Sequence, residues 1–548
     1  MAGIDIAKEV ATLTPKKAVG LLFGAYILYS IIRIIYRGQT SPLRHLPGPW
    51  YTKYTHYVLM WKVMAGQRDF YIDHLHQKYG QTVRTTPTEA DFMDAESFKK
   101  IHHVSSKFIK DPWYEAVNFL PRPSIFNTRD PKDHGERRRV LAKNFTVAHL
   151  RTHFDPMVRE LCASAVEKIV LRGQRDGETD LLDWVRLACS DVIGKTIFGE
   201  SFGMIENEKR NEHIRVLDVV LLFGGFTSEM PWLRSVCSIL PFKAIQEAYN
   251  SVDFILNGAQ PAVDNARSST NTNHKTILAS CIQDQIVGKE KGVPQWDDTH
   301  IKIEALTLHI AGAGASATNI GFCWWQLLEL PDLMHRLEAE AAALPPDFDD
   351  KMIEERCPLL EATLHESLRL WAAVPSSLPR LAPPEGAVLG GYAIPAGTTV
   401  CTQAYSMHRD PMYWDNPMKF DPSRFLPGAK LHKDARSILS GFGAGAYSCL
   451  GNNIAKMKFR YMTVMLLRMA PGLKSHKDQP ALKEENMLTW IAILPKTNKI
   501  LGDFSDVDWS RSLPIVGDKQ RENGTVPIQG RGEKEVEVMV QSTAQSVL

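Results

Sequence analysis

The chain has 548 residues, of which 44% are hydrophobic and 23% are charged, as is ordinary for a globular protein. Its formal net charge of +2 excludes the strongly basic composition of a nucleic-acid-binding protein. The eight cysteines form no Cys-x-x-Cys pair and are too sparse for a disulfide scaffold, which favours a reducing compartment.

The first predicted element is an apolar helix near the N-terminus. Residues 18–36 carry Arg33 as their only charge and are flanked by basic residues. As a helix they span about 28 Å, close to the hydrocarbon thickness of a bilayer. A cleaved signal peptide is the alternative, but no small-residue cleavage site follows. We therefore predict residues 1–17 as an N-terminal segment, 18–36 as a membrane anchor and 37–50 as a proline-rich hinge.

Short elements follow the hinge. Residues 71–79 show a helical pattern, and residues 82–85 read as a strand. The run 108–126 is loop-like and rich in aromatic residues and proline. Packing in the core explains this run as well as a role in lining a substrate site does.

A strongly basic helix comes next. His134 and Arg138 lie four residues apart, and therefore on one face of the helix that Asp133 is expected to begin. Arg137 and Arg139 add to its charge, and for these two we expect a solvated surface.

Two apolar regions precede a long helix. Residues 191–203 predict a buried helix followed by a turn, and residues 216–242 are too apolar for an ordinary surface loop. The helical pattern resumes from 298 to 343. Within it, residues 311–318 read Ala-Gly-Ala-Gly-Ala-Ser-Ala-Thr. Glycine weakens a helix, but these small residues leave room for a flat cofactor or ligand close to the backbone.

The C-terminal third predicts short strands and a polar tail. Strands are expected at 388–394 and 398–404, and a last hairpin near 488–493. From 503 to 548 the composition is polar and irregular, which predicts a mostly disordered tail.

One cysteine lies in a glycine-rich loop. Residues 442–451 read Phe-Gly-Ala-Gly-Ala-Tyr-Ser-Cys-Leu-Gly, and a helical pattern starts near Asn452. Glycine lets the backbone turn tightly and approach a partner. Cys449 precedes a helix N-terminus, whose positive field favours the thiolate. Thiolate is the metal-ligating form, and on a haem iron it favours cleavage of an O–O bond.

This loop matches the Phe-x-x-Gly-x-Arg-x-Cys-x-Gly signature of haem-thiolate oxygenases, so the chain resembles a cytochrome P-450. It is most similar in style to membrane-anchored fungal enzymes of secondary metabolism. The resemblance extends over about residues 47–503. It implies a mainly α fold with small β-sheets, in which one large haem-thiolate catalytic domain at 51–502 follows one transmembrane helix.

The resemblance also implies how haem is held. Cys449 is the expected iron ligand, and Phe442 is expected to pack on the same side. The residues expected to hold the haem propionates are His134, Arg138 and Arg380. Tyr447 stands where the family usually has an arginine. A phenol can hydrogen-bond a carboxylate but cannot neutralise it, so anchoring of the cofactor must depend on other residues.

A structural network is implied by a second motif. Glu366 and Arg369 lie three residues apart on a predicted helix, where their charges meet. An exposed pair of this kind contributes little. Residues 420–425 read Phe-Asp-Pro-Ser-Arg-Phe and resemble the family segment whose arginine, here Arg424, joins that pair in a buried network.

The oxygen-activating motif of the family aligns from Ala311, but its acid and its alcohol would fall on Gly314 and Ala315. Neither group is present. Ser316 and Thr318 are the candidate catalytic hydroxyls, although Ser316 lies about 100° around the helix from Ala315. Protons then come from ordered water, from these hydroxyls through a distorted helix, or from the substrate. We favour water or the substrate.

The implied function is oxidation of a lipophilic small molecule, expected to be a secondary metabolite, with O₂ and electrons from NADPH through a cytochrome P-450 reductase. Residues 216–242 would form a lid, and the catalytic domain would face the cytosol from the endoplasmic reticulum membrane. Nucleic acid is not an expected partner. One alternative is haem-thiolate rearrangement, dehydration or coupling without net hydroxylation. The other is a membrane-anchored haem-binding accessory protein without turnover.

A basic patch is expected to guide the acidic reductase to the proximal side of the haem. The residues of the predicted patch are Arg137, Arg139, Lys143, Lys456, Lys458 and Arg460.

Overall fold

The computed structural model describes residues 14–118, 120–212, 256–268, 276–290 and 296–514, together with positions 216, 225, 228–230 and 252. Most of the expected lid at 216–242 therefore lies outside the described residues. The same holds for residues 1–13 and for the tail beyond 514.

The described α-helices are α2 (Pro15–Thr40), α3 (Tyr57–Met64), α4 (Arg68–Tyr79), α5 (Ala95–His102), α6 (Trp113–Ala116), α7 (Pro131–Ala142), α8 (Val147–His153), α9 (Asp155–Asp176), α10 (Leu181–Phe198), α14 (Gln260–Ser268), α15 (Ile277–Glu290), α16 (Asp298–Leu328), α17 (Pro331–Ala342), α18 (Asp350–Arg356), α19 (Pro358–Trp371), α20 (Ala404–Met407), α21 (Ala435–Ile438) and α22 (Asn452–Met469). The described strands are β1 (Thr82–Thr86), β2 (Glu89–Phe92), β3 (Ile109–Lys110), β4 (Glu178–Asp180), β5 (Arg380–Leu381), β6 (Ala387–Leu389), β7 (Tyr392–Ile394), β8 (Thr399–Cys401), β9 (Lys474–Ser475), β10 (Met487–Thr489), β11 (Ile493–Pro495) and β12 (Leu501–Asp503).

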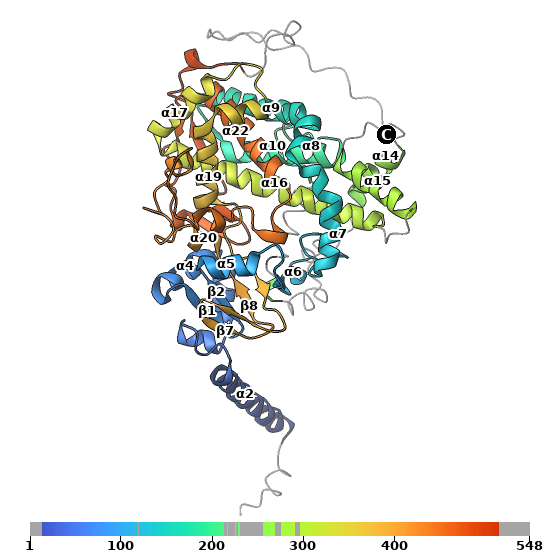
Figure 1. Ribbon diagram of the computed structural model, residues 1–548, viewed down its shortest axis with the longest axis vertical. Helices are drawn as coiled ribbons and strands as arrows, with labels where there is room; N and C mark the ends of the chain where they lie inside the picture. Colours follow the sequence, from blue (N-terminus) through green and yellow to red (C-terminus); the bar gives the residue numbers. More distant parts are fainter. Residues whose placement is uncertain are drawn as a thin grey trace, which may run out of the picture.

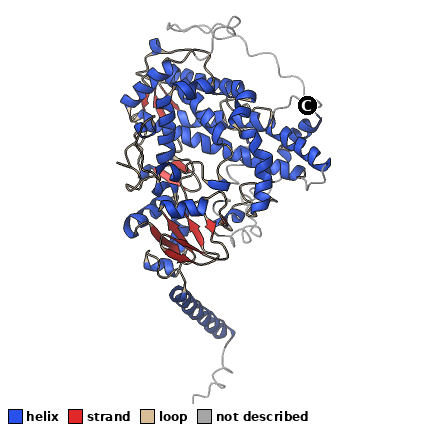
Figure 2. Cartoon of the chain, viewed as in Figure 1, coloured by secondary structure: helices blue, strands red, loops and turns tan. Residues whose placement is uncertain are grey.

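The strands form small sheets at the edge of a helical body (Figure 2). A five-stranded sheet has the order β1-β2-β8-β5-β3, with β2 and β8 parallel and the other neighbours antiparallel. The predicted strands at 388–394 form the hairpin β6–β7, and the last predicted hairpin is β10–β11. A mainly helical fold with small sheets is therefore confirmed.

Helix α2 projects from the end of the body where the five-stranded sheet lies (Figure 1). It is longer at both ends than the predicted segment 18–36. An 18-residue window within residues 19–40 has a mean hydropathy of 1.8, and none of this window is buried in the protein. Its apolar side chains, such as Leu22 and Phe23, are exposed. By length and composition α2 can cross a membrane, which would cover these side chains.

The centre of the body is formed by α16 and the helices against it (Figure 1). Trp324 on α16 is buried and donates a hydrogen bond to the Thr463 hydroxyl of α22 at 3.0 Å. Gly312 lets α16 approach α10 closely, because a Cβ at this position would lie 2.7 Å from Cδ1 of Ile193. Each large apolar side chain buried here stabilises the fold by about 1.5–3 kcal/mol.

Two helix boundaries differ from expectation. The pattern from 298 to 343 is interrupted, because Pro331 disfavours helical geometry at the residue before it, and Leu330 has φ −127° and ψ 71°. Helix α7 is capped by Asp130 rather than Asp133: its carboxylate accepts a hydrogen bond from the backbone N–H of Lys132.

The chain stays ordered beyond 503, where the sequence predicted disorder. Phe504 is 2% exposed and lies against Gly173 of α9, where any Cβ would collide with the ring. Trp509 stacks on Phe504, with the rings inclined by 11°. The prediction is wrong for 503–514, because these few apolar side chains find buried positions despite polar surroundings in the sequence.

Candidate functional site

The loop before α22 folds around two glycines. Gly443 and Gly445 have φ of +68° and +64°, which favours glycine. At Gly445, moreover, a Cβ would collide with the carbonyl oxygen of His102 at the end of α5. The backbone N–H of Cys449 donates to the carbonyl of Phe442 at 2.8 Å, which closes the loop. The sequence pattern thus places Cys449 directly ahead of α22.

The residue Cys449 lies just ahead of α22 and is exposed. Cys449 is the exposed thiol among the described cysteines, all the others being buried. Even so, enough protein surrounds it for desolvation to raise its pKa. The backbone N–H groups of Gly451 and Asn452 donate to the sulfur, and Arg138 and Lys458 lie near enough to act in the same direction, towards the thiolate. A thiolate in this position can ligate a metal ion that a bound cofactor carries.

Helix α16 contributes an open face of small residues. Ala311 and Gly314 are exposed although α16 crosses the middle of the molecule, and a Cβ on Gly314 would meet nothing within 4 Å. Ala315 is half-buried, whereas Ser316 is buried. Residues three and four apart share a helix face, so the open face contains the positions of the missing acid and alcohol.

A hydrogen bond joins helices α16 and α22 beside the open face of α16. The Nζ atom of Lys458 donates a hydrogen bond to the carbonyl oxygen of Gly312 at 2.6 Å. The bond brings the open turn of α16 next to the helix that follows Cys449. A flat ligand held by the thiol would therefore lie close to backbone that carries no large side chain.

Arg380 and Lys110 form the centre of a buried basic cluster. Arg380 donates to the Tyr114 hydroxyl at 2.9 Å, while its Nε atom is buried without a hydrogen-bond partner. Its guanidinium lies 4.8 Å from the ring centre of Tyr447, and Nζ of Lys110 lies 5.1 Å from the same ring. Burial, and then the charge of Arg380, lowers the pKa of Lys110 to about 7.

His134 and Arg138 extend the cluster. Burial, followed by the charges of Lys110 and Arg138, lowers the pKa of His134 to about 4. The His134 ring meets Tyr447 edge-on at 4.7 Å. Arg138 donates to the carbonyl and hydroxyl oxygens of Ser448 at 2.7 and 3.0 Å. These bonds stabilise the loop 442–451 that carries Cys449, here called the thiol loop.

The cluster lacks an anion. Within the described part of the chain, none of its four basic side chains forms an ion pair with a carboxylate, and burying charge without a partner is costly. A ligand whose carboxylates bind these side chains would supply the missing negative charge. The haem propionates are carboxylates of this kind. Lys110 was missed by sequence reasoning, because a single lysine in a two-residue strand follows no pattern that shows its burial.

The structural network assembles as expected from the sequence. Arg369 donates to both carboxylate oxygens of Glu366 at 2.7 and 2.8 Å, and both side chains are fully buried. Arg424 lies 3.4 Å from the same carboxylate, which also accepts the backbone N–H of Asp421 at 2.8 Å. Arg369 further donates to the carbonyl of His408 at 2.6 Å. The network joins α19 to the segment that leads to the thiol loop.

The predicted basic patch is wrong for three of its six residues. Arg137 is buried and pairs with Glu304 at 2.6 Å, so the expectation of a solvated side chain is also wrong. Arg460 is buried in ion pairs with Asp350, Glu354 and Glu361, and Lys458 is buried as well. The residues of the patch that stay at least partly accessible are Arg139, Lys143 and Lys456.

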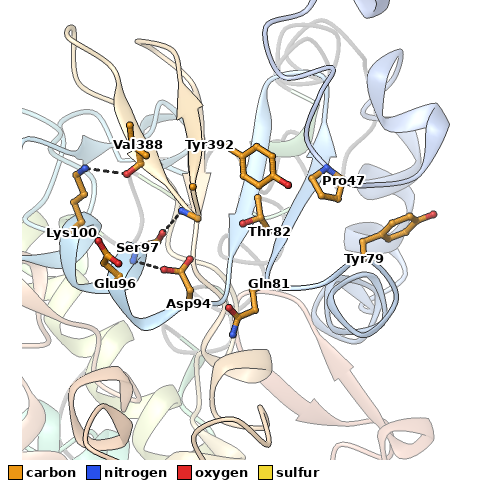
Figure 3. Close-up of a pocket in the computed structure, with 12 residues that line it drawn as sticks. Pro47, Tyr79, Gln81, Thr82, Asp94, Glu96, Ser97, Lys100, Val388 and Tyr392 are labelled. Atoms are coloured by element: carbon orange, nitrogen blue, oxygen red, sulfur yellow. Dashed lines mark hydrogen bonds between the residues drawn. The ribbon is translucent and has the colours of Figure 1, made fainter.

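A separate cavity of about 580 Å³ lies beside the hinge (Figure 3). It is bordered by Pro47, by Thr82 on β1 and by Tyr392 on β7. Lys100, on its wall, donates to the carbonyl of Val388 at 3.0 Å. No residue that the sequence predicted for the haem site lines this cavity, so it is distinct from the thiol site.

Known proteins share this architecture. The family model described as Cytochrome P450 matches residues 47–501. The cytochrome P450 monooxygenase aflV of Aspergillus parasiticus is 33% identical over 491 residues, covering 87% of this chain and 94% of the relative. Methylphloroacetophenone oxidase of Cladonia uncialis is 31% identical over 401 residues, covering 69% and 85%. The solved cytochrome P450DA heme domain superposes with a TM-score of 0.70 at 17% identity, covering 85% and 99%.

Proposed function

Because the chain belongs to the cytochrome P450 family, it is a haem-dependent monooxygenase, and we propose that Cys449 is the thiolate ligand of its haem iron. The observation that carries this assignment is the position of the thiol. Cys449 is exposed and accepts hydrogen bonds from the N-terminus of α22, whereas the other described cysteines are buried. Such hydrogen bonds stabilise the thiolate and tune its donation to iron.

The basic cluster is proposed to hold the propionates. Arg380 and Lys110 supply the charge, and His134 adds a neutral ring nitrogen. Tyr447 contributes a hydroxyl where the family usually has an arginine, and Arg138 acts by bracing Ser448. A haem held by these residues would supply reductive activation of O₂: with two electrons and two protons, one oxygen atom would enter the substrate and the other would leave as water.

We propose that the substrate is a lipophilic secondary metabolite. The open face of α16 carries Ala311, Gly314 and Ala315, which leave room for a bulky ring system. The relatives support this class, since they are fungal monooxygenases and include an oxidase named for methylphloroacetophenone, a phenolic ketone. Oxidative coupling or rearrangement of such a substrate is the second candidate, and the missing acid and alcohol favour it.

Turnover tests the function directly. The purified protein is given reductase, NADPH and candidate phenolic or polycyclic substrates, and NADPH consumption is compared with products analysed for inserted oxygen. Hydroxylated product supports the proposal. Substrate-stimulated consumption without inserted oxygen indicates coupling or rearrangement. No consumption under any condition indicates an accessory haem protein and contradicts the proposal.

Proton delivery is expected to bypass Ser316. Oxygen activation consumes protons, and a positioned donor typically contributes about 100-fold or more to a rate. Ser316 and Thr318 are buried, and α16 shows no break that would turn them towards the open face. We therefore expect Ser316→Ala to keep the wild-type ratio of product formed to NADPH consumed. Ala315→Thr places a hydroxyl on the open face and is expected to change that ratio or exclude the substrate. A collapse of the ratio in Ser316→Ala would assign the proton to that serine.

The membrane and the reductase complete the proposal. We propose that α2 anchors the enzyme in the endoplasmic reticulum membrane with the catalytic domain in the cytosol, and that NADPH–cytochrome P450 reductase delivers the electrons. The exposed apolar side chains of α2 support the anchor.

The reductase is expected to use the accessible part of the basic patch. Arg139 and Lys143 are exposed on the segment that precedes α8. The double variant Arg139→Glu/Lys143→Glu should weaken the apparent affinity for reductase and flatten its dependence on ionic strength, because screened charge pairs are lost. The matched control is Lys496→Glu/Lys499→Glu, which reverses two exposed charges elsewhere. Equal salt dependence in both double variants would contradict this surface.

A further inference from the structure

Lys458 is a buried lysine that the proposed mechanism does not yet use. It lies on α22 with 1% of its surface exposed, and its ammonium donates to the carbonyl of Gly312 at 2.6 Å. Among the described residues no carboxylate pairs with it. A single carbonyl does not compensate a buried full charge, so Lys458 keeps its charge only beside a group that supplies a negative one.

The titratable groups around Lys458 leave one candidate. Burial lowers the pKa of Lys458, and the thiols of Cys189, Cys162 and Cys449 oppose this effect. Cys162 and Cys189 are themselves buried, and desolvation raises the pKa of each thiol, which keeps both neutral. His309 on α16 is also buried, and burial followed by the charge of Lys458 lowers its pKa to about 3, so it carries no charge. Cys449 is the remaining member of the group. Lys458 lies seven residues, two helical turns, after Gly451, the residue that caps α22, and a Cβ on Gly451 would lie 3.8 Å from Sγ of Cys449. Cys449 becomes an anion when it binds iron.

We propose that Lys458 is a positioning residue that provides the buried counter-charge of the Cys449 thiolate while it holds α16 at Gly312. This inference rests on the proposed assignment of Cys449 as the iron ligand. One-electron reduction of the haem iron adds a negative charge to the site. A buried cation nearby favours the reduced state, since electrostatic interactions are strong where water is excluded. Lys458 therefore sets how easily the first electron is accepted.

Two neutral variants separate the charge from the hydrogen bond. Lys458→Met removes both, whereas Lys458→Gln keeps a neutral N–H donor, on a side chain one bond shorter, for the Gly312 carbonyl. The control is Lys456→Met, which removes a charge two residues away on the same helix. The haem-loaded proteins are titrated anaerobically with dithionite and a redox dye, and the carbon monoxide difference spectrum is recorded for each. We expect both neutral variants at Lys458 to lower the equilibrium constant for reduction about tenfold, a shift of 59 mV to more negative potential, and the control to stay at the wild-type value.

The outcomes are distinct. Wild-type potential in both neutral variants, or an equal shift in Lys456→Met, would overturn the proposal. A shift in Lys458→Met without one in Lys458→Gln would assign the effect to the hydrogen bond and overturn the role of the charge. If neither neutral variant retains haem, Lys458→Arg decides, because a charge role requires this variant to keep the thiolate spectrum and a near-native potential. A wild-type protein without the thiolate spectrum would instead refute the assignment of Cys449.

Discussion

Replacing Cys449 with alanine is expected to abolish the thiolate signature of the haem together with all turnover. Carbon monoxide added to the reduced wild-type protein should give the strongly red-shifted Soret band of thiolate ligation. The variant lacks the sulfur that accepts hydrogen bonds from the N–H groups of Gly451 and Asn452, and no other described thiol is exposed. The change removes the electron donation on which O–O cleavage depends.

The control for this experiment is Cys189→Ala. Cys189 is buried on α10 and lies close enough to Lys458 to affect its pKa, but it is not exposed as Cys449 is. The control should keep the red-shifted band and measurable turnover. If Cys449→Ala also kept the band, the ligand assignment would be wrong. Cys449→Ser is expected to lose the band too, because an alkoxide or water ligand lacks the thiolate's electron donation.

The second large effect is expected at Glu366. Glu366→Gln leaves Arg369, which is fully buried, without its counter-charge, and breaking a buried pair in this way typically costs 3–5 kcal/mol. Because whole domains are stable by only about 5–15 kcal/mol, we expect the variant to unfold at much lower urea concentration and to lose haem. The measurement is urea unfolding of the haem-loaded protein, followed by Soret absorbance and circular dichroism.

An exposed ion pair gives the comparison. Glu355 pairs with Lys351 at 3.8 Å, and both side chains are more than half exposed. Glu355→Gln removes the same charge from a short helix and should barely move the unfolding midpoint, since exposed pairs are screened by water. Equal midpoints for Glu366→Gln and Glu355→Gln would show that the network is not what stabilises the segment before the thiol loop.

The local sequence pattern was sufficient to predict those features of the protein that depend only on residues close together in the sequence. The spacing of Glu366 and Arg369, the glycines around Cys449 and the apolar run that became α2 each predict their own geometry. The run of small residues in α16 was likewise recognised from consecutive positions in the sequence. In each case the backbone conformation or the helix face follows from a few consecutive residues, so no distant contact has to be known.

Tertiary structure alone decided which charged residues are inside. Arg137, Lys458 and Arg460 lie on helices that the sequence shows as basic, yet all three are buried. The first two are bonded to α16, and Arg460 is paired with carboxylates of α18 and α19. Lys110 joins the basic cluster because β3 pairs with β5, which carries Arg380. The order of the chain up to 514 likewise depends on the contact of Phe504 with α9. Burial of a charge is set by elements distant in sequence, because only their packing removes water and supplies or withholds a counter-charge.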